Sequence, residues 1–177
     1  EALFDDPAAV LAAVENEFSA LERELLRPAE QDQVYDQVVS KGELISSLIV
    51  HHYLISKDTA CEWIDARTCI RTDSSFREGK VDWARTSANI QQLKPVLSNK
   101  IIITQGFIGR TEDGLTTTLG REGSDFTAAI FGSSLDAESV TIWKDVAGVM
   151  NADPRRFPNA VVFAELPFKE AAEMTYY

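Results

Sequence analysis

The residues best suited to chemistry lie between Gly120 and Asp125, where two glycines, a guanidinium, a hydroxyl and a carboxylate fall close together. The residues that follow, up to Phe131, have helical composition, so these groups should collect at a helix N-terminus. Backbone N–H groups are unsatisfied there, and the helix dipole attracts anions. The alternative is a plain glycine turn in which Ser124 or Asp125 only caps the helix. The pattern therefore predicts an anion-binding site and leaves a structural turn open.

Glu43 is a second candidate. The run Ser40-Lys41-Gly42-Glu43 precedes a helical pattern of apolar residues that includes Leu44 and Ile45. Serine followed three positions later by glutamate is the capping box, in which the glutamate bonds back to the N–H of the cap residue. From the residues alone, Glu43 is therefore predicted to cap a helix that begins here.

Four longer blocks of the sequence resemble the aspartate kinases. They are VSKGELISS (39–47), TQGFIGRTEDGLTTTLGREGSDFTAA (104–129), IWKDVAGVMNADPR (142–155) and FKEAAEMTYY (168–177). The order and spacing of these blocks are more specific than any single glycine motif. The resemblance implies ATP-dependent phosphorylation of the β-carboxylate of L-aspartate, the first step of lysine, threonine and methionine biosynthesis.

The resemblance also implies a substrate site. The matching glutamate of the family holds the substrate amino group, so Glu43 is implied as a substrate contact. Arg121, Ser124 and Asp125 are implied as further contacts, with Arg121 and Asp125 as the catalytic residues. Their chemistry suits these roles, because a guanidinium binds a carboxylate through a bidentate fork. The carboxylates of Asp125 and Glu43 can accept from the ammonium, and Ser124 can donate to the α-carboxylate.

The nucleotide should lie beyond the carboxyl ends of parallel strands. Lys144 and Asp145 end a predicted strand at 140–143, and the resemblance implies that Asp145 lies near ATP with Lys144 beside it. It also implies that Arg155 binds the phosphates, and Met150 can cover the adenine face with its thioether. Mg²⁺ is expected through the phosphates alone, with no metal site of the protein's own. The alternative is a solvated strand end and a surface loop.

Three positions depart from the family pattern. Glu122 stands where the family commonly has glycine, which adds a negative charge near the anion site. Lys144 stands where threonine is common, and Met150 where tyrosine is common. Met150 therefore offers no ring for stacking on adenine, and Lys144 is expected to offset part of the charge of Glu122.

The chain starts at Glu1 and stops at Tyr177 within an apparent helix, so we expect it to be part of one catalytic domain spanning 1–177. By resemblance, the parts not present are a lysine–glycine–glycine–threonine–serine phosphate loop, a lysine beyond Tyr177, and C-terminal ACT domains that bind an amino-acid effector. We expect no turnover by the chain alone, because losing one preorganised donor typically costs about 10²–10³ in rate. The intact protein is expected to form a homo-oligomer.

Composition excludes some classes of partner. The net charge of −11 over 177 residues disfavours nucleic acid and anionic membranes. No apolar run approaches the roughly 18 residues of a membrane span, and no signal peptide is visible, so we expect a cytoplasmic protein. Cys61 and Cys69 lack metal-ligand spacing and are expected to be reduced structural thiols.

The elements that must position these residues alternate between helix and strand. Ile101, Ile102 and Ile103 predict a buried central strand, and a helix is expected at 124–134. The other expected elements are an amphipathic helix from Pro7 to the Pro28 region, a helix after Glu43, a strand at 61–64 with 66–70 beside it, a helix at 82–97, strands at 140–143 and 161–163, and a helix from about 167. Alternation predicts an α/β/α sandwich of three layers with a largely parallel sheet. By resemblance this is the amino-acid-kinase fold in incomplete form.

Two other functions stay open. Within the superfamily, the chain could derive from a kinase for glutamate, acetylglutamate or UMP. In another class, it could be a noncatalytic module that binds aspartate. Calorimetry with aspartate and an ATP analogue would separate an amino-acid sensor from a kinase, because the sensor would ignore the nucleotide.

Overall fold

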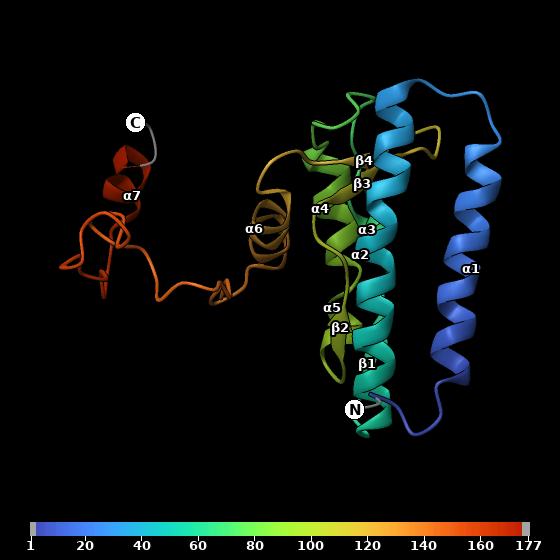
Figure 1. Cartoon of the computed structure of the whole chain (residues 1–177), viewed down its shortest axis with the longest axis horizontal. Helices are drawn as coiled ribbons and strands as arrows, with labels where there is room; N and C mark the ends of the chain where they lie inside the picture. Colours follow the sequence, from blue (N-terminus) through green and yellow to red (C-terminus); the bar gives the residue numbers. More distant parts are fainter. Residues whose placement is uncertain (1–2, 175–177) are drawn as a thin grey trace. The chain divides into compact units, whose positions relative to one another are not determined.

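The computed structural model describes residues 3–174 and divides the chain into two compact units, Glu1–Val140 and Thr141–Tyr177. Each unit is described by itself (Figure 1). The first contains α1 (Ala8–Leu25), α2 (Gln31–Ser56), β1 (Cys61–Trp63), α3 (Ala66–Cys69), α4 (Trp83–Gln91), α5 (Lys94–Leu97), β2 (Ile101–Ile103), β3 (Ile108–Arg110), β4 (Thr116–Thr118) and α6 (Gly123–Leu135). The second contains α7 (Phe168–Met174).

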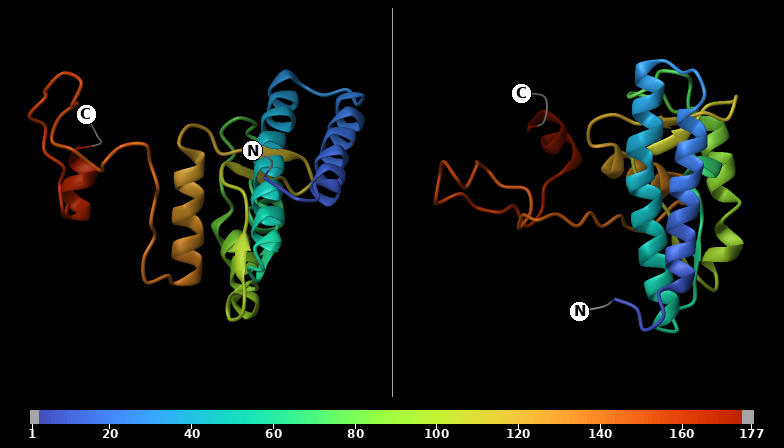
Figure 2. Two further views of the ribbon diagram at one scale, coloured as in Figure 1. Left: turned by 60° about the horizontal axis from the view of Figure 1, so that its bottom comes forward. Right: turned by 45° about the vertical axis from the view of Figure 1, so that its right-hand side comes forward.

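The two longest helices, α1 and α2, lie side by side (Figures 1 and 2). The chain enters α1 as predicted, because Asp6 Oδ1 accepts a hydrogen bond of 3.0 Å from the backbone N–H of Ala8. A buried cation contributes to the contact between the two helices. The Lys41 side chain of α2 is only 5% exposed, and its ammonium lies 3.1 Å from Glu17 and 3.6 Å from Glu24 of α1.

Two short sheets pack on the other side of α2. Strand β1 pairs in parallel with β2, with Cys61 opposite Ile101. Strands β3 and β4 form an antiparallel hairpin, with Ile108 opposite Thr118. Leu44 of α2 packs with Ile108 in one buried apolar cluster, and a second cluster joins α3, α4 and α6. Helix α2 is therefore contacted by α1 on one side and by both sheets on the other.

The predicted start of the second helix was wrong. Helix α2 begins at Gln31, well before Ser40, so Glu43 lies in its interior and forms no capping box. Ser40 is buried, and its hydroxyl donates to the backbone carbonyl of Gln37 at 3.0 Å. Sequence periodicity missed the first part of the helix because its buried side carries polar residues, including Asp36 and Lys41.

Several shorter elements also differ from prediction. Strand β2 forms where expected, but it is not a buried central strand, because Ile101 is 53% exposed and β2 pairs only with β1 among the described residues. The segment expected beside β1 is helix α3, and the hairpin β3–β4 was not predicted. The helix expected at 82–97 is divided into α4 and α5. Asp82 does cap α4, accepting from the backbone N–H of Arg85 at 3.0 Å.

The second unit has little regular structure. The strand predicted at 140–143 was wrong, because these residues are exposed and pair with no strand in the described part of the chain. At 161–163 a single bridge joins Val162 to Met150. Helix α7 begins at Phe168, as expected from Pro167.

Two further expectations concern chemistry rather than fold. Cys61 and Cys69 are both buried and free, as predicted. Among the described residues, no helix is both long enough and apolar enough to cross a membrane.

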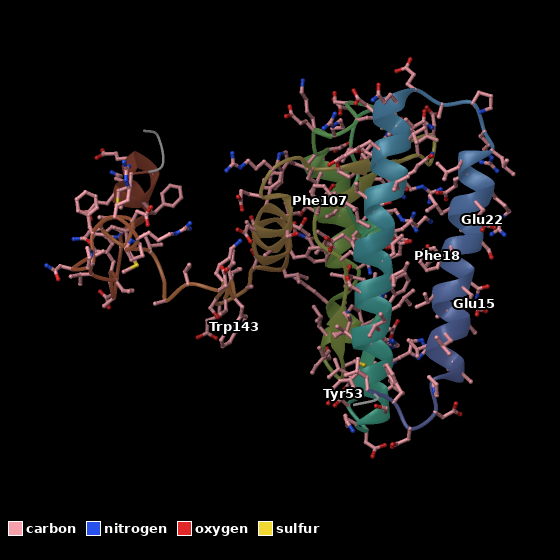
Figure 3. All side chains as sticks on the ribbon, viewed as in Figure 1. Glu15, Phe18, Glu22, Tyr53, Phe107 and Trp143 are labelled. Carbon is pink, nitrogen blue, oxygen red and sulfur yellow. The ribbon has the colours of Figure 1, made fainter. Side chains whose placement is uncertain are left out.

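The Lys41 contacts give a test of how α1 is held. Glu17→Gln should lower the free energy of unfolding by about 1–3 kcal/mol, because the buried ammonium then has a neutral acceptor at position 17 and keeps only the longer charged contact to Glu24. Glu15→Gln is the matched control, since Glu15 lies on the side of α1 away from α2 (Figure 3) and should change stability by less than about 0.5 kcal/mol. Urea unfolding measures both, and equal losses would contradict the role of the buried ion pair.

Candidate active site

The loop that carries Arg121 leaves β4 and enters α6 through two left-handed residues. Gly120 has φ +77°, and a Cβ there would lie 3.3 Å from the carbonyl oxygen of Arg77. Glu122 is the N-cap residue, with φ 58° and ψ 21°, and its side chain makes no capping bond to the helix. Ser124 and Asp125 therefore lie in the first turn of α6, and the alternative in which one of them caps the helix is wrong.

The backbone at Glu122 gives a physical reason for glycine at this position in the aspartate-kinase pattern. A left-handed residue other than glycine carries a strain of roughly 1–2 kcal/mol, which glycine avoids. Here the strain falls on a residue that also adds a negative charge beside Arg121, whose Nε lies 3.9 Å from Glu122 Oε1. The departure thus affects both the backbone and the charge of the loop.

The segment Gly106–Phe107 lies against the start of α6. A Cβ on Gly106 would approach the Cα of Ser124 to 2.9 Å, so only glycine fits there. Phe107 has φ 70°, its N–H donates to Thr127 Oγ1 at 3.0 Å, and its carbonyl accepts from the N–H of Leu119 at 2.8 Å. Figure 3 shows Phe107 between α2 and α6.

Glu43 lies on α2 next to residues of that helix that contact the same segment. It lies on the helix face that includes Ser40, Leu44 and Ser47, and Phe107 packs against the cluster that contains Leu44. One turn beyond Glu43, Ser47 Oγ accepts from Gln105 Nε2 at 2.7 Å. Because Gln105 directly precedes Gly106, this bond holds the segment on α2 close to Glu43.

The electrostatics of Glu43 differ from those of an exposed acid. Partial burial raises the pKa of the Glu43 carboxyl above its ordinary value of 4.5. The protein therefore bears a cost for keeping the ionised form at neutral pH. A cation bound beside the carboxylate would offset that cost, as the ammonium of an amino acid can.

A cavity of about 720 Å³ opens beside Arg121. It is bounded by α2, the loop at 75–80, Phe107 and the end of β4. Its charged lining residues are Asp32, Arg77, Glu78, Lys80 and Arg121. The Arg121 side chain is 95% exposed, so its guanidinium is available to an anion that enters the cavity.

The four predicted substrate residues lie on two elements, and of these four only Arg121 lines the cavity. Glu43 is on α2, whereas Arg121, Ser124 and Asp125 are at the start of α6, and Gly106–Phe107 lies between. The sequence reasoning missed the cations of the loop at 75–80, since that loop has no periodicity or motif. It also missed Asp36, a buried acid of α2.

The predicted nucleotide residues lie in the second unit. Met150 and Arg155 line a cavity of about 560 Å³ together with Gly148 and Pro154. Arg155 is held at its backbone, whose N–H donates to Asp153 Oδ1 at 2.9 Å, while its side chain is 93% exposed. Lys144 and Asp145 are exposed and do not line this cavity, because the strand expected to position them does not form.

No metal cluster stands out within residues 3–174. Histidine, cysteine, aspartate and glutamate side chains nowhere gather in groups of three or more that could hold an ion.

Comparison with known proteins decides the family. Residues 6–177 match the amino acid kinase family. The chain belongs to that family. Lysine-sensitive aspartokinase 3 of Escherichia coli (strain K12) is 43% identical over 143 residues, which is 80% of this chain and 32% of that protein. The chloroplastic bifunctional aspartokinase/homoserine dehydrogenase 2 of Arabidopsis thaliana is 35% identical over 178 residues, 98% of this chain and 19% of that protein. The chain spans less than a third of the length of either relative.

Two solved structures of an aspartokinase also resemble this chain. The crystal structure of E. coli aspartokinase III with aspartate and ADP, in the R-state, has a TM-score of 0.87 at 36% identity and covers 98% of this chain and 39% of that one. The same enzyme with lysine and aspartate, in the T-state, gives 0.83 at 38% identity, covering 94% of this chain and 38% of that one. The predicted α/β amino-acid-kinase fold and the resemblance to aspartate kinases are therefore confirmed.

The raised pKa of Glu43 predicts an unusual effect on stability. A raised folded-state pKa contributes stability that is fully present below the unfolded value of 4.5 and is lost as pH rises through the folded value. Glu43→Gln cannot ionise and so removes the loss of stability at high pH. The variant should therefore melt at a higher temperature than the wild type at pH 7. The difference should vanish below about pH 4.5.

Calorimetric melting across pH measures the effect. Glu15→Gln serves as the control, because Glu15 is exposed on α1 and should give the same pH profile as the wild type. A Glu43→Gln variant that is less stable than the wild type at pH 7 would show that the ionised carboxylate stabilises the fold.

Proposed function

We propose that the protein transfers the γ-phosphoryl group of ATP to the β-carboxylate of L-aspartate. The observation that carries the proposal is that Gly106–Phe107 packs both on α2, the helix that carries Glu43, and on the start of α6, which follows Arg121. An amino acid with an acidic side chain needs one anionic acceptor for its ammonium and cationic donors for its carboxylates, and this arrangement offers both. The likeness to an aspartokinase crystallised with aspartate and ADP supports the choice of substrate.

In this proposal each side chain has a separate task. The Glu43 carboxylate accepts hydrogen bonds from the substrate ammonium, and Asp125 adds a second acceptor. The Arg121 guanidinium binds a carboxylate as a bidentate fork, and Ser124 donates to the α-carboxylate. Arg121 and Asp125 are the proposed catalytic residues, because they fix the acceptor oxygen in line with the γ-phosphorus. An oxygen of the β-carboxylate then bonds to phosphorus as the bond to the ADP oxygen breaks.

The residues that we propose to bind the nucleotide lie in the second unit. Met150 and Arg155 line one cavity, in which a thioether can cover the adenine and a guanidinium can reach a phosphate. Lys144 and Asp145 are proposed near the same nucleotide by resemblance. Mg²⁺ would be held through the phosphates and would neutralise part of their charge. A homo-oligomer, an amino-acid effector and a cytoplasmic location stay predictions for the intact gene product.

Removing the proposed carboxylate donor tests the substrate. Arg121→Ala should lower kcat/KM for aspartate by about a hundredfold and leave KM for ATP nearly unchanged, because a bidentate charged contact is lost. The assay traps β-aspartyl phosphate as its hydroxamate, with the intact gene product, MgATP and aspartate. Arg85→Ala is the control, since Arg85 is an exposed cation paired with Asp82 and Glu112 and does not line the Arg121 cavity. An unchanged specificity constant for aspartate would remove Arg121 from the site.

The amino group is tested separately. Glu43→Gln should lower kcat/KM for aspartate by about ten- to a hundredfold, because an amide gives the ammonium only a neutral acceptor. Calorimetry with aspartate and an ATP analogue supplies the binding data. Binding of aspartate together with indifference to the nucleotide would replace the kinase by a noncatalytic aspartate-binding module. Near-wild-type kinetics would show that Glu43 does not touch the substrate.

A further inference from the structure

Asp36 is a buried acid that the proposed mechanism does not use. Its side chain has no exposed surface and projects from the first half of α2. Oδ2 accepts from the backbone N–H of Arg77 and from that of Thr118, both at 2.9 Å. Oδ1 accepts from the hydroxyl of Thr118 at 2.8 Å. One carboxylate thus joins α2 to two segments that lie about 40 and 80 residues further along the chain.

Both of those segments line the Arg121 cavity. Arg77 belongs to the loop at 75–80, and Thr118 ends β4 directly before Leu119, Gly120 and Arg121. The two segments are also bonded directly to each other, because the N–H of Gly79 donates to the carbonyl of Thr118 at 2.8 Å. A Cβ on Gly120 would lie within 3.3 Å of the loop.

Asp36 acts on the backbone of Arg77 rather than on its charge. The Arg77 guanidinium lies over the ring of Tyr35 at 4.4 Å, and its Nη1 lies 3.3 Å from Asp32 Oδ1. Asp32 and Asp36 are one helical turn apart on α2, so the exposed acid pairs with the Arg77 side chain and the buried acid with the Arg77 main chain. The two acids can therefore be removed independently.

The same helix carries Glu43. Seven residues separate Asp36 from Glu43, which is about 10.5 Å along a helix and nearly two full turns, so both lie on one face. Because an α-helix is stiff over this length, fixing Thr118 to Asp36 also fixes the start of the Arg121 loop relative to Glu43. The hydrogen bond from Gln105 to Ser47 fixes the Gly106 segment to the same helix, on the other side of Glu43 along the chain.

We infer that Asp36 is a positioning residue that sets the spacing between the Glu43 carboxylate and the Arg121 guanidinium, and so the fit of the amino-acid substrate. The inference rests on the proposed function for the identity of that substrate. A carboxylate suits the task, because a single group can accept from two backbone N–H donors and a hydroxyl at once. The three bonds leave α2, β4 and the loop at 75–80 little freedom to shift against one another.

The test varies Asp36 in the intact gene product and compares aspartate with ATP. Asp36→Ala should raise KM for aspartate by about ten- to a hundredfold, because the buried bonds to a charged acceptor are lost. KM for ATP and kcat should change by less than about threefold, because Asp36 touches neither the nucleotide cavity nor the reacting atoms. Asp36→Asn should stay within about threefold of the wild type, since its amide oxygen can keep both N–H donors while its amino group meets the Thr118 hydroxyl.

Three further variants complete the series. Thr118→Val removes one of the three bonds and should raise KM for aspartate by about three- to tenfold. Glu15→Gln is the kinetic control, because Glu15 is an exposed acid of α1 that does not line the Arg121 cavity; its kinetics should equal those of the wild type. Asp32→Asn removes the exposed ion pair to Arg77 and leaves the backbone anchor intact, so it serves as the control for the anchor itself. If Asp36→Ala raised KM for aspartate and KM for ATP and lowered kcat to a similar extent, the inference would be overturned and Asp36 would be a general stabiliser. So would wild-type kinetics in Asp36→Ala.

Hydrogen exchange separates this inference from the proposed function. The amides of Arg77 and Thr118 should exchange about tenfold faster or more in Asp36→Ala, and at wild-type rates in Asp32→Asn. Wild-type protein that never phosphorylates aspartate would refute the proposed function, and exchange would then still decide whether Asp36 anchors both segments. Unchanged exchange at both amides would overturn the positioning role whatever the substrate.

Discussion

Three hydrogen bonds to the buried Asp36 carboxylate connect α2 with the end of β4 and with the loop at 75–80. These contacts matter because neither β4 nor the loop is long enough to hold a position by itself. Strand β4 has three residues, and the loop has no regular structure. Helix α2, whose buried side is polar, therefore fixes the position from which the Arg121 loop starts, and the same helix carries Glu43.

The candidate active site also concentrates conformational and electrostatic costs. Phe107 and Glu122 both adopt positive φ without being glycine, and such residues persist only where their surroundings hold them. At Phe107 the surroundings are the bonds to Thr127 and Leu119. Partial burial of the Glu43 carboxyl raises its pKa. Costs of this kind are typical of a site prepared for a ligand, since the bound cation or anion offsets part of them.

Charge is distributed so that a strongly acidic protein still presents cations to an anionic ligand. The chain has a net charge of −11, yet Arg77, Lys80 and Arg121 line one cavity. Acids in the same lining are engaged with particular partners, as Asp32 is with Arg77. Local placement therefore governs recognition here more than the total charge does.

The sequence by itself determined the features that depend on neighbours along the chain. Asp6 and Asp82 act at helix starts as predicted, the helix after Gly123 forms, and Arg121, Ser124 and Asp125 collect at its beginning because they are adjacent in sequence. Only the tertiary structure decided that Glu43 lies inside a helix, that a hairpin follows Phe107, and that no strand forms at 140–143. It also decided the role of Asp36, whose partners are remote in sequence. The physical reason is that capping and turns use bonds within a few residues, whereas burial of a polar helix face and pairing of short strands depend on partners that sequence periodicity cannot supply.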